Sequence, residues 1–323
     1  MMSSSCARLI WAATRAARLS CATMAALVGT GLATPPDVGA APSIRGISAG
    51  PGRRVSPLPS PELSASLDRT AGQEDVSAAT TTVTYSNWSG YAATAAAPFN
   101  EAQTTFVQPS VTCTVPGAWT VFWVGFDGFN NNTVEQAGTA AQCGSGSDPQ
   151  PVYYAWWEMY PSNPIQVMRQ VAITPGDTIH AAVAYTASTA SYTLNVADLT
   201  DKQQYTELAS CARNLTCARS SADWIVERPT LFNGTGYTSL TPLADWSTMR
   251  LASNDASDST KSVTTGDRHH RVTTITNVLQ PVSAFSNAAI NMGGDAEAGV
   301  TLARVGKLDR AGSAFSDTWQ AAQ

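Results

Sequence analysis

The sequence is poor in histidine, and it lacks the motifs in which histidine usually does catalytic work. Only His180, His269 and His270 occur in 323 residues. The G-x-S-x-G match at residues 46–50 lies in a Pro- and Ser-rich segment and not at a strand-to-helix elbow, and there is no H-E-x-x-H helix and no D-T-G repeat of the two-aspartate peptidases. A serine triad needs a histidine beside its nucleophile. We therefore expect all three histidines to be structural or surface residues.

Basic residues are also scarce. From residue 83 to residue 323, 12 Lys and Arg stand against 19 Asp and Glu, a formal net charge of −7. Nucleic-acid binding relies on basic patches that displace counterions, so no nucleic-acid partner is expected. Few bases also leave little self-repulsion once acid has neutralised the carboxylates. The composition is therefore compatible with an acidic environment.

Cysteine is sparse, and its spacing matches no zinc motif. Two of the six cysteines lie in the first 40 residues, and the others are Cys113, Cys143, Cys211 and Cys217. An even set in an exported chain indicates disulfides. Three pairings are possible, and we favour Cys113 with Cys143 and Cys211 with Cys217 because both close local loops. No metal and no cofactor is expected.

A long apolar run occurs only near the N-terminus. It covers residues 19–33, follows Arg8, Arg15 and Arg18, and precedes small residues up to Ala40. This order is typical of a secretory signal peptide, and the run is shorter than the roughly 20 residues of a bilayer span. We expect residues 1–40 to be a signal peptide, and the secreted protein to have no membrane association.

Residues 41–82 contain no aromatic residue and are rich in Pro, Ser, Gly and Ala. Such a segment cannot bury enough apolar surface to offset the entropy lost on ordering. It is therefore expected to be a linker or propeptide, and residues 83–323 form the folded domain.

Helical spacing of apolar residues is missing from this domain. Short runs rich in Val, Thr and aromatic residues alternate instead with Gly, Pro, Asn, Asp and Ser clusters, which indicates an antiparallel sandwich or barrel. The expected strands are 82–85, 102–107, 120–126, 133–137, 152–160, 166–173, 178–185, 192–198, 222–227, 248–252, 271–278 and 314–319.

Three of these strands bring acids and aromatic rings to one face, because successive strand side chains alternate. The shared faces are Trp123, Gly125 and Asp127; Tyr154, Trp156, Glu158 and Tyr160; and Asp223, Ile225 and Glu227. Three such faces together indicate a binding cleft. A wet sheet surface and a platform for sugar rings remain open as alternatives.

With histidine and metal motifs missing, the groups left for catalysis in such a cleft are carboxyls and amides. Glu227, Glu158, Asp127 and Glu135 all lie in or beside strand-like segments, and the first three are close to aromatic residues; burial in such surroundings raises a carboxyl pKa and allows proton exchange in mild acid. Chemistry alone does not choose among them. Two carboxylates across a cleft would also suit a glycoside hydrolase.

Five segments resemble, in order, the signature blocks of the glutamic peptidases, or eqolisins. They are SNWSGY at 86–91, WVGFDG at 123–128, VEQAGT at 134–139, YYAWWEMYP at 153–161 and ADWIVERP at 222–229. The stretch AGSAFS at 311–316, before Trp319, resembles the family's final strand. One block alone is a weak signal, whereas five in order are specific.

The resemblance implies a concanavalin A or lectin-like β-sandwich of two packed antiparallel sheets with a concave active-site face. It also implies a secreted, acid-acting, pepstatin-insensitive endopeptidase that hydrolyses polypeptide substrates as a monomer. By motif, the catalytic pair is Gln136 and Glu227, and the residues that line or support the cleft are Trp88, Trp123, Asp127, Trp156 and Glu158. The polar stretch 255–271 departs from the family and is expected to be an elongated loop.

In such an enzyme Glu227 would take a proton from the attacking water, and the Gln136 amide would donate to the oxyanion. Residues 41–82 would then act as a propeptide that covers the cleft and detaches in acid, leaving a start near residues 75–85. The alternative functions are a lectin-like carbohydrate-binding module and a glycoside hydrolase.

Overall fold

The computed structural model describes residues 47–53, 80–232, 237–259, 262–266, 272–294 and 300–322. The expected signal peptide, His269 and His270 lie outside these residues. Within these described ranges, no helix has the length and apolar character needed to cross a membrane.

Strands dominate the described chain. They are β1 (Ile47–Ser48), β2 (Thr81–Tyr85), β3 (Trp88–Thr94), β4 (Phe99–Val107), β5 (Trp119–Phe126), β6 (Val134–Cys143), β7 (Pro151–Tyr160), β8 (Gln166–Val167), β9 (Thr178–Thr186), β10 (Ser191–Asp198), β11 (Gln203–Ala209), β12 (Ser221–Glu227), β13 (Thr230–Phe232), β14 (Tyr237–Leu240), β15 (Thr248–Asp258), β16 (Ser262–Gly266), β17 (Val272–Thr276), β18 (Gln280–Pro281), β19 (Ser286–Gly293), β20 (Thr301–Val305) and β21 (Phe315–Trp319). A 3₁₀ turn covers Val282–Ala284.

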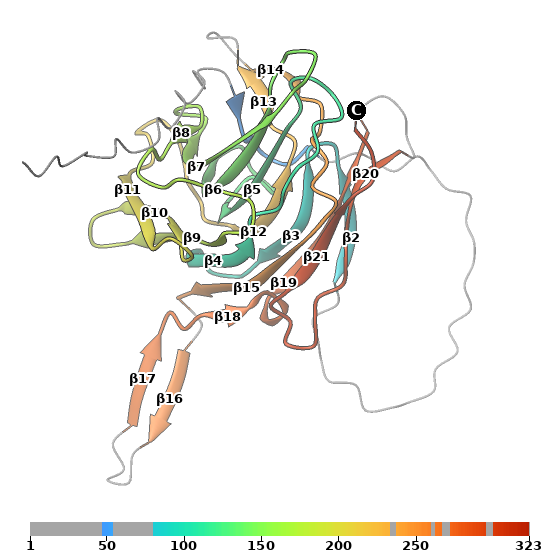
Figure 1. Ribbon diagram of the computed structural model, residues 1–323. Coiled ribbons are helices and arrows are strands. Elements are labelled where there is room, and N and C mark those ends of the chain that lie inside the picture. The colour runs from blue at the N-terminus through green and yellow to red at the C-terminus, as the bar shows by residue number, and fades with distance from the viewer. Residues whose placement is uncertain are drawn as a thin grey trace, which may run out of the picture. The chain divides into compact units, whose positions relative to one another are not determined.

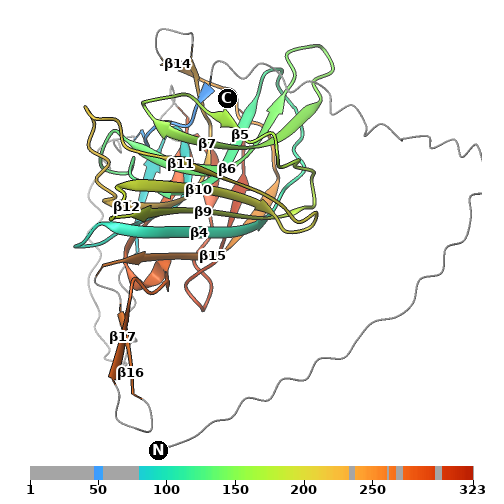
Figure 2. The same cartoon turned by 90° about the vertical axis from the view of Figure 1, so that its left-hand side faces the viewer.

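Most of these strands belong to one hydrogen-bonded path, β11-β10-β9-β4-β15-β21-β20-β19-β3-β12-β5-β6-β7-β8. β15 pairs with β4 along most of its length and with β21 at its first residues. The sheet therefore folds at β15, and the strands on either side of this fold form two layers. Figure 2 looks onto the layer formed by β15, β4, β9, β10 and β11, with β5, β6 and β7 behind it. The expected antiparallel sandwich is confirmed.

The main core lies between the two layers. Phe122, Val124 and Phe126 of β5 point into it, as their alternation predicts, and they share this core with Ile179 and Leu194 of the facing layer. Burying an apolar side chain of this size contributes about 1.5–3 kcal/mol. This core fixes the plane of β5, β6 and β12, and so fixes which side chains point to their other face.

That other face carries a second apolar cluster. Trp88, Trp123, Trp156 and Ile225 are fully buried there, together with Ala49 from the N-terminal segment. The dark blue β1 lies beside β13 in Figure 1, and the two strands are paired. The segment 47–53 thus covers an aromatic surface that would otherwise face water.

Several expectations from the sequence need correction. Only Gln166–Val167 of the expected strand 166–173 is a strand. The expected loop 255–271 is wrong, because β15 runs on to Asp258, and β16 pairs with β17 as a hairpin that extends away from the large sheet in Figure 1. The two favoured disulfides, Cys113–Cys143 and Cys211–Cys217, are both confirmed.

Candidate active site

Strand register brings Gln136 and Glu227 to the same face. Gln136 of β6 is paired with Gly125 of β5, which is paired in turn with Asp223 of β12. Directly paired residues of antiparallel strands point to the same side. Glu227 lies four residues beyond Asp223 on one strand, so it shares that side too. The predicted alternation is confirmed within these strands, but Asp127 does not continue it, because β5 ends at Phe126 and Asp127 has a φ of 66°.

Gln136 is fully buried and makes contacts through its amide nitrogen. Nε2 donates to the backbone carbonyl of Ala49 and, at 3.3 Å, to Oε2 of Glu158 on the neighbouring strand. Oε1 accepts no hydrogen bond from any residue in the described part of the chain. The donor side of this amide therefore meets a peptide carbonyl.

Glu227 is also fully buried. Its Oε2 accepts a hydrogen bond from Trp123 Nε1 at 2.9 Å, and its Oε1 accepts one from Asn87 Nδ2 at 3.3 Å. Burial raises the pKa of this carboxyl well above its usual value, and the charge of Glu158 raises it further. The two hydrogen bonds oppose that rise, and they fix the direction of the carboxyl group.

Glu158 joins the two sides of the site. Oε1 accepts from the Ser48 hydroxyl, and Oε2 accepts from the Ala49 amide at 2.9 Å. Burial raises the pKa of Glu158 well above its usual value, and these two hydrogen bonds lower it. Glu158 thus holds the Gln136 amide and the N-terminal segment in register with each other.

The tryptophans form the wall of the site. Trp88 stacks edge-on against Trp123 with ring centroids 5.0 Å apart, and its Nε1 donates to the Gly50 carbonyl at 3.1 Å. Trp156 is buried on the same face. The expectation that these three residues line one surface together with Glu158 agrees with their positions.

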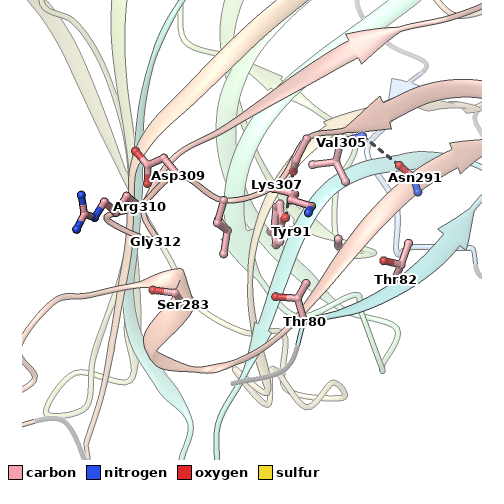
Figure 3. A pocket seen from close by; sticks show the side chains of 13 residues that line it. Thr80, Thr82, Tyr91, Ser283, Asn291, Val305, Lys307, Asp309, Arg310 and Gly312 are labelled. Atoms are coloured by element: carbon pink, nitrogen blue, oxygen red, sulfur yellow. Dashed lines mark hydrogen bonds between the residues drawn. The ribbon is translucent and has the colours of Figure 1, made fainter. Parts of the chain in front are cut away.

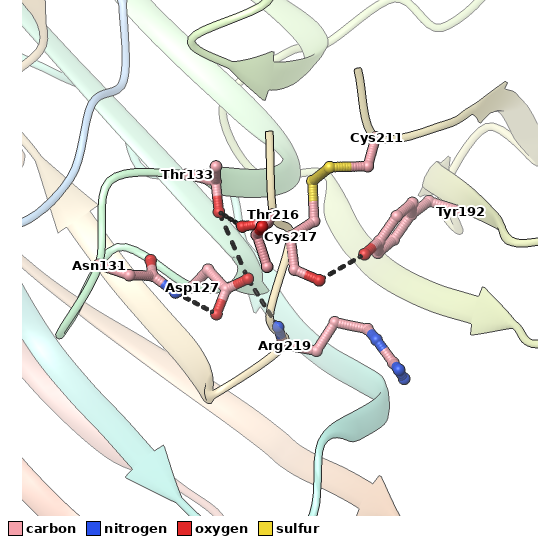
Figure 4. Close-up of a disulfide and its surroundings, with 8 residues drawn as sticks. All are labelled: Asp127, Asn131, Thr133, Tyr192, Cys211, Thr216, Cys217 and Arg219. Carbon is pink, nitrogen blue, oxygen red and sulfur yellow. Dashed lines mark hydrogen bonds between the residues drawn. A yellow bond between two sulfur atoms is a disulfide. The ribbon is translucent and has the colours of Figure 1, made fainter. Parts of the chain in front are cut away.

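Asp127 has a different set of contacts (Figure 4). Its carboxylate accepts 2.7 Å hydrogen bonds from the backbone amides of Arg219 and Ser220 and from the side chain of Asn131. It thereby holds the loop that follows the Cys211–Cys217 disulfide. Its role as a substrate-binding residue stays a prediction, since the described hydrogen bonds to its carboxylate all come from residues outside the strands.

Sequence reasoning missed Asn87, although it stands in the first signature block. Its Nδ2 donates to Glu227 and, at 3.1 Å, to the Pro51 carbonyl, while its Oδ1 accepts from the Arg53 amide at 2.7 Å. Asn87 therefore connects the carboxyl of Glu227 to the backbone of the chain's own residues 51–53. Its position next to Trp88 in the block was the available signal.

A family model supplies the remaining evidence. The model of the Peptidase A4 family matches residues 86–292, more than half of the chain, and this span includes Gln136, Glu158 and Glu227. This chain belongs to the Peptidase A4 family. Among curated proteins, none matches the sequence.

Solved structures of glutamic peptidases share the fold. Scytalido-glutamic peptidase, solved with a transition-state analogue inhibitor, is 19% identical with a TM-score of 0.56, over 73% of this chain and 98% of that chain. SCP-B, an eqolisin solved with the tripeptide Ala-Ile-His, is 20% identical with a TM-score of 0.51, over the same shares. The family and the fold support a peptidase rather than a sugar-binding module or a glycosidase.

Two other features of this Peptidase A4 chain lie apart from the face formed by Trp88, Trp123 and Trp156, called the aromatic face below. A pocket of about 740 Å³ (Figure 3) is lined by residues that include Tyr91 and Asn291, and neither Gln136 nor Glu227 lines it. Within the described chain, the ligand oxygens of Asp177, Asp198 and Asp201 lie within 4.8 Å of one another and could hold a cation. These aspartates lie at the ends of β9, β10 and β11 and are not part of the aromatic face.

Proposed function

We propose that this protein is an acid endopeptidase that hydrolyses polypeptides with Gln136 and Glu227 as its catalytic pair. One observation carries the proposal: a peptide carbonyl, that of Ala49, accepts a hydrogen bond from the Gln136 amide on the face that Glu227 shares. The pair is complete within one chain, which supports action as a monomer.

The two side chains suit different parts of peptide hydrolysis. Glu227 takes a proton from a water as that water attacks the carbonyl carbon, and later returns a proton to the leaving nitrogen. Gln136 does not titrate. Its Nε2 donates to the oxyanion that forms on the attacked carbonyl, and its Oε1 orients the water. Trp123 and Asn87 keep the Glu227 carboxyl in place through their hydrogen bonds.

The protonation state of Glu227 depends on what covers the site. With residues 47–53 in place, burial raises the pKa of Glu227 well above its usual value. A protonated carboxyl cannot accept a proton from water, so hydrolysis with the segment in place is slow and proceeds through the ionised fraction of Glu227. Removing the segment lets water reach the carboxyl, which lowers its pKa and makes it a base in mild acid.

The same reasoning supports residues 41–82 as a propeptide. Of its described residues, 47–53 bond to Glu158, Gln136 and Trp88, whereas Thr81 and Thr82 belong to β2 and pair with β19. We further propose that residues 1–40 are a signal peptide and that the protein is secreted, since two disulfides suit an oxidising compartment.

Digestion of an unfolded protein tests the proposed function. After acid treatment, the wild-type chain should cut acid-denatured protein in the presence of pepstatin and a chelator, and Glu227→Gln should not. The matched control is Glu207→Gln, the same exchange on β11, a strand at the other end of the sheet path, where the carboxylate accepts a hydrogen bond from Tyr205; it should keep full activity. Equal activity of wild type and Glu227→Gln would remove Glu227 from the mechanism. Cleavage of a polysaccharide without cleavage of protein would favour the glycosidase alternative.

A further inference from the structure

We propose that residues 47–53 lie in the cleft as a built-in substrate, and that Ala49–Gly50 is the first bond that the enzyme cuts in its own chain. The inference rests on the proposed function and adds to it the bond, the register and a sequence requirement. The segment lies upstream of residues 86–292, which match the family model.

The part of the segment before this bond is bound as an added strand. Ile47 pairs with Leu231, and Ser48 pairs with Thr230, in antiparallel register. Main-chain pairing of this kind is a common way for a protein to bind an extended peptide. The Ala49 amide then donates to Glu158 at 2.9 Å, and the Ala49 side chain is fully buried. The backbone is therefore held up to the residue that carries the carbonyl.

The carbonyl contacts fix the register. Gln136 Nε2 donates to the carbonyl of Ala49, and Trp88 Nε1 donates to the next carbonyl, that of Gly50, at 3.1 Å. Gln136 is the oxyanion donor in the proposed mechanism, so the carbonyl that it contacts is the one that water attacks. A shift by one residue would bring a different carbonyl to Gln136.

The part after the bond is held as firmly. The Pro51 carbonyl accepts from Asn87 at 3.1 Å, and the Gly52 amide donates to the Gly128 carbonyl at 3.1 Å. The Arg53 amide donates to Asn87 Oδ1 at 2.7 Å. Contacts on both sides of Ala49–Gly50 therefore hold this bond in a fixed position at the site, as cleavage requires.

The segment also indicates a sequence requirement. A Cβ added to Gly52 would lie 2.5 Å from Cδ1 of Tyr85 and 2.9 Å from the Trp88 ring, too close for any side chain. A Cβ added to Gly50 would meet only the Tyr160 ring, at an ordinary 3.5 Å. We infer that the enzyme prefers glycine at the third position after the cut and accepts alanine at the first.

The chemical step is ordinary hydrolysis. A water oxygen bonds to the Ala49 carbonyl carbon while its proton passes to Glu227, and the bond from this carbon to the Gly50 nitrogen then breaks. The proton returns to that nitrogen, which leaves a carboxyl group on Ala49 and an amine on Gly50. The chain from residue 54 to residue 79 still joins Gly50 to β2, so opening the cleft fully needs a second cut there.

Acid activation of the full chain tests the position of the first cut. The chain, purified at neutral pH, is shifted to acid, and samples are taken over time for intact mass and N-terminal sequencing. The first new N-terminus should be Gly50, appearing at a rate independent of protein concentration. In Gly52→Ala this cut should be at least tenfold slower, while the matched variant Gly50→Ala should be cut at a rate within about threefold of wild type.

Short peptides test the sequence requirement without any question of folding. A peptide with the sequence of residues 44–56 should be cut between its Ala and Gly by the acid-activated enzyme. Its Gly52→Ala form should lose at least tenfold in kcat/KM, and its Gly50→Ala form should lose little. If unfolded protein is digested but the first cut lies elsewhere, or both alanine peptides behave alike, the inference is wrong and the proposed function stands. If no protein is digested at all, the proposed function itself fails.

Discussion

At the scale of single residues, the site contains one amide that donates hydrogen bonds, that of Gln136, and two carboxyls that accept them, those of Glu158 and Glu227. Gln136 lies 3.3 Å from Glu158 through its Nε2, so a glutamine here can donate both to that carboxyl and to a substrate carbonyl. A glutamate at position 136 would place two carboxyls side by side. Such pairs share a proton and cannot both ionise. The difference between an amide and an acid at this position is therefore chemical rather than steric.

Gln136→Glu should lose about 10²- to 10³-fold in turnover, as expected when a preorganised oxyanion donor is removed. The measurement is the rate of cleavage of an unfolded protein at several acid pH values. Gln204→Glu, the same exchange at an exposed position of β11, serves as the matched control and should change nothing. Near-wild-type turnover of Gln136→Glu in acid would show that the amide has no such role.

The sequence identified part of this site correctly and had no means to identify the rest. Alternation along three strands placed Trp123, Glu158 and Glu227 on one face, and the structure agrees. The roles of Ser48 and Ala49 could not be predicted, because Ala49 bonds through backbone atoms that every residue possesses. Residues 41–82 contain too few apolar residues to fold by themselves. Their composition does not indicate which surface binds residues 47–53.

At the scale of elements, the face that carries Gln136 and Glu227 depends on a close approach between β5 and β6. Gly138 is paired with Trp123, and a Cβ added to Gly138 would lie 2.7 Å from the Trp123 Cα and 2.8 Å from its Cβ. Because Gly138 has no side chain, β6 can approach the backbone of β5 this closely at Trp123. This contact sets the position of the group that donates to Glu227.

Gly138→Ala should therefore destabilise the protein by about 1–3 kcal/mol, the usual cost of overpacking a well-packed site. Urea unfolding followed by tryptophan fluorescence measures the difference. Gly146→Ala is the matched control, because its added Cβ would meet nothing within 4 Å in an exposed loop. A Gly138→Ala variant as stable as Gly146→Ala would mean that the two strands can separate at no cost.

The sequence predicted the strands rich in aromatic and branched residues, and it missed those made of small ones. β3 (WSGYAAT) and β19 (SNAAINMG) lie side by side next to β12, yet neither was expected. Their small side chains carry little β-propensity, and their place in the sheet comes from pairing with neighbours that are distant in sequence. In the hairpin, β17 falls within the expected strand 271–278, whereas β16 was missed because the residues around it are mostly polar.

At the scale of the whole molecule, buried carboxyls connect stability to pH. Burial raises the pKa of Glu135, Glu158, Asp223 and Glu227 well above their usual values. Burial also raises the pKa of Asp317 to about 7, although a 2.5 Å hydrogen bond from Ser89 opposes this rise. In the unfolded chain these groups titrate near pH 4. The folded state therefore binds more protons than the unfolded state between about pH 4 and the raised values.

The free energy of unfolding should consequently be largest in mild acid and fall as the pH rises through about 7. For Asp317 alone, the difference between its usual 3.8 and about 7 corresponds to on the order of 4 kcal/mol, lost once the pH exceeds the folded-state pKa. Urea unfolding between pH 5 and pH 8 measures the part of this loss that lies above pH 5, in a Glu227→Gln background, which on the proposed mechanism does not digest itself.

Asp317→Asn in that background should make the loss between pH 5 and pH 8 clearly smaller, because one group that must give up its proton in the folded state is gone. Asp309→Asn is the matched control. Hydrogen bonds from the Ser313 and Ala314 amides and the partner Arg250 lower the Asp309 pKa, so its titration is complete below pH 5 and its removal should leave the slope unchanged. Equal slopes for Asp317→Asn and Asp309→Asn would show that the buried Asp317 does not couple folding to pH. A protein that gains stability toward pH 8 would contradict the sign of the whole effect, and with it the view that this fold is built to work in acid.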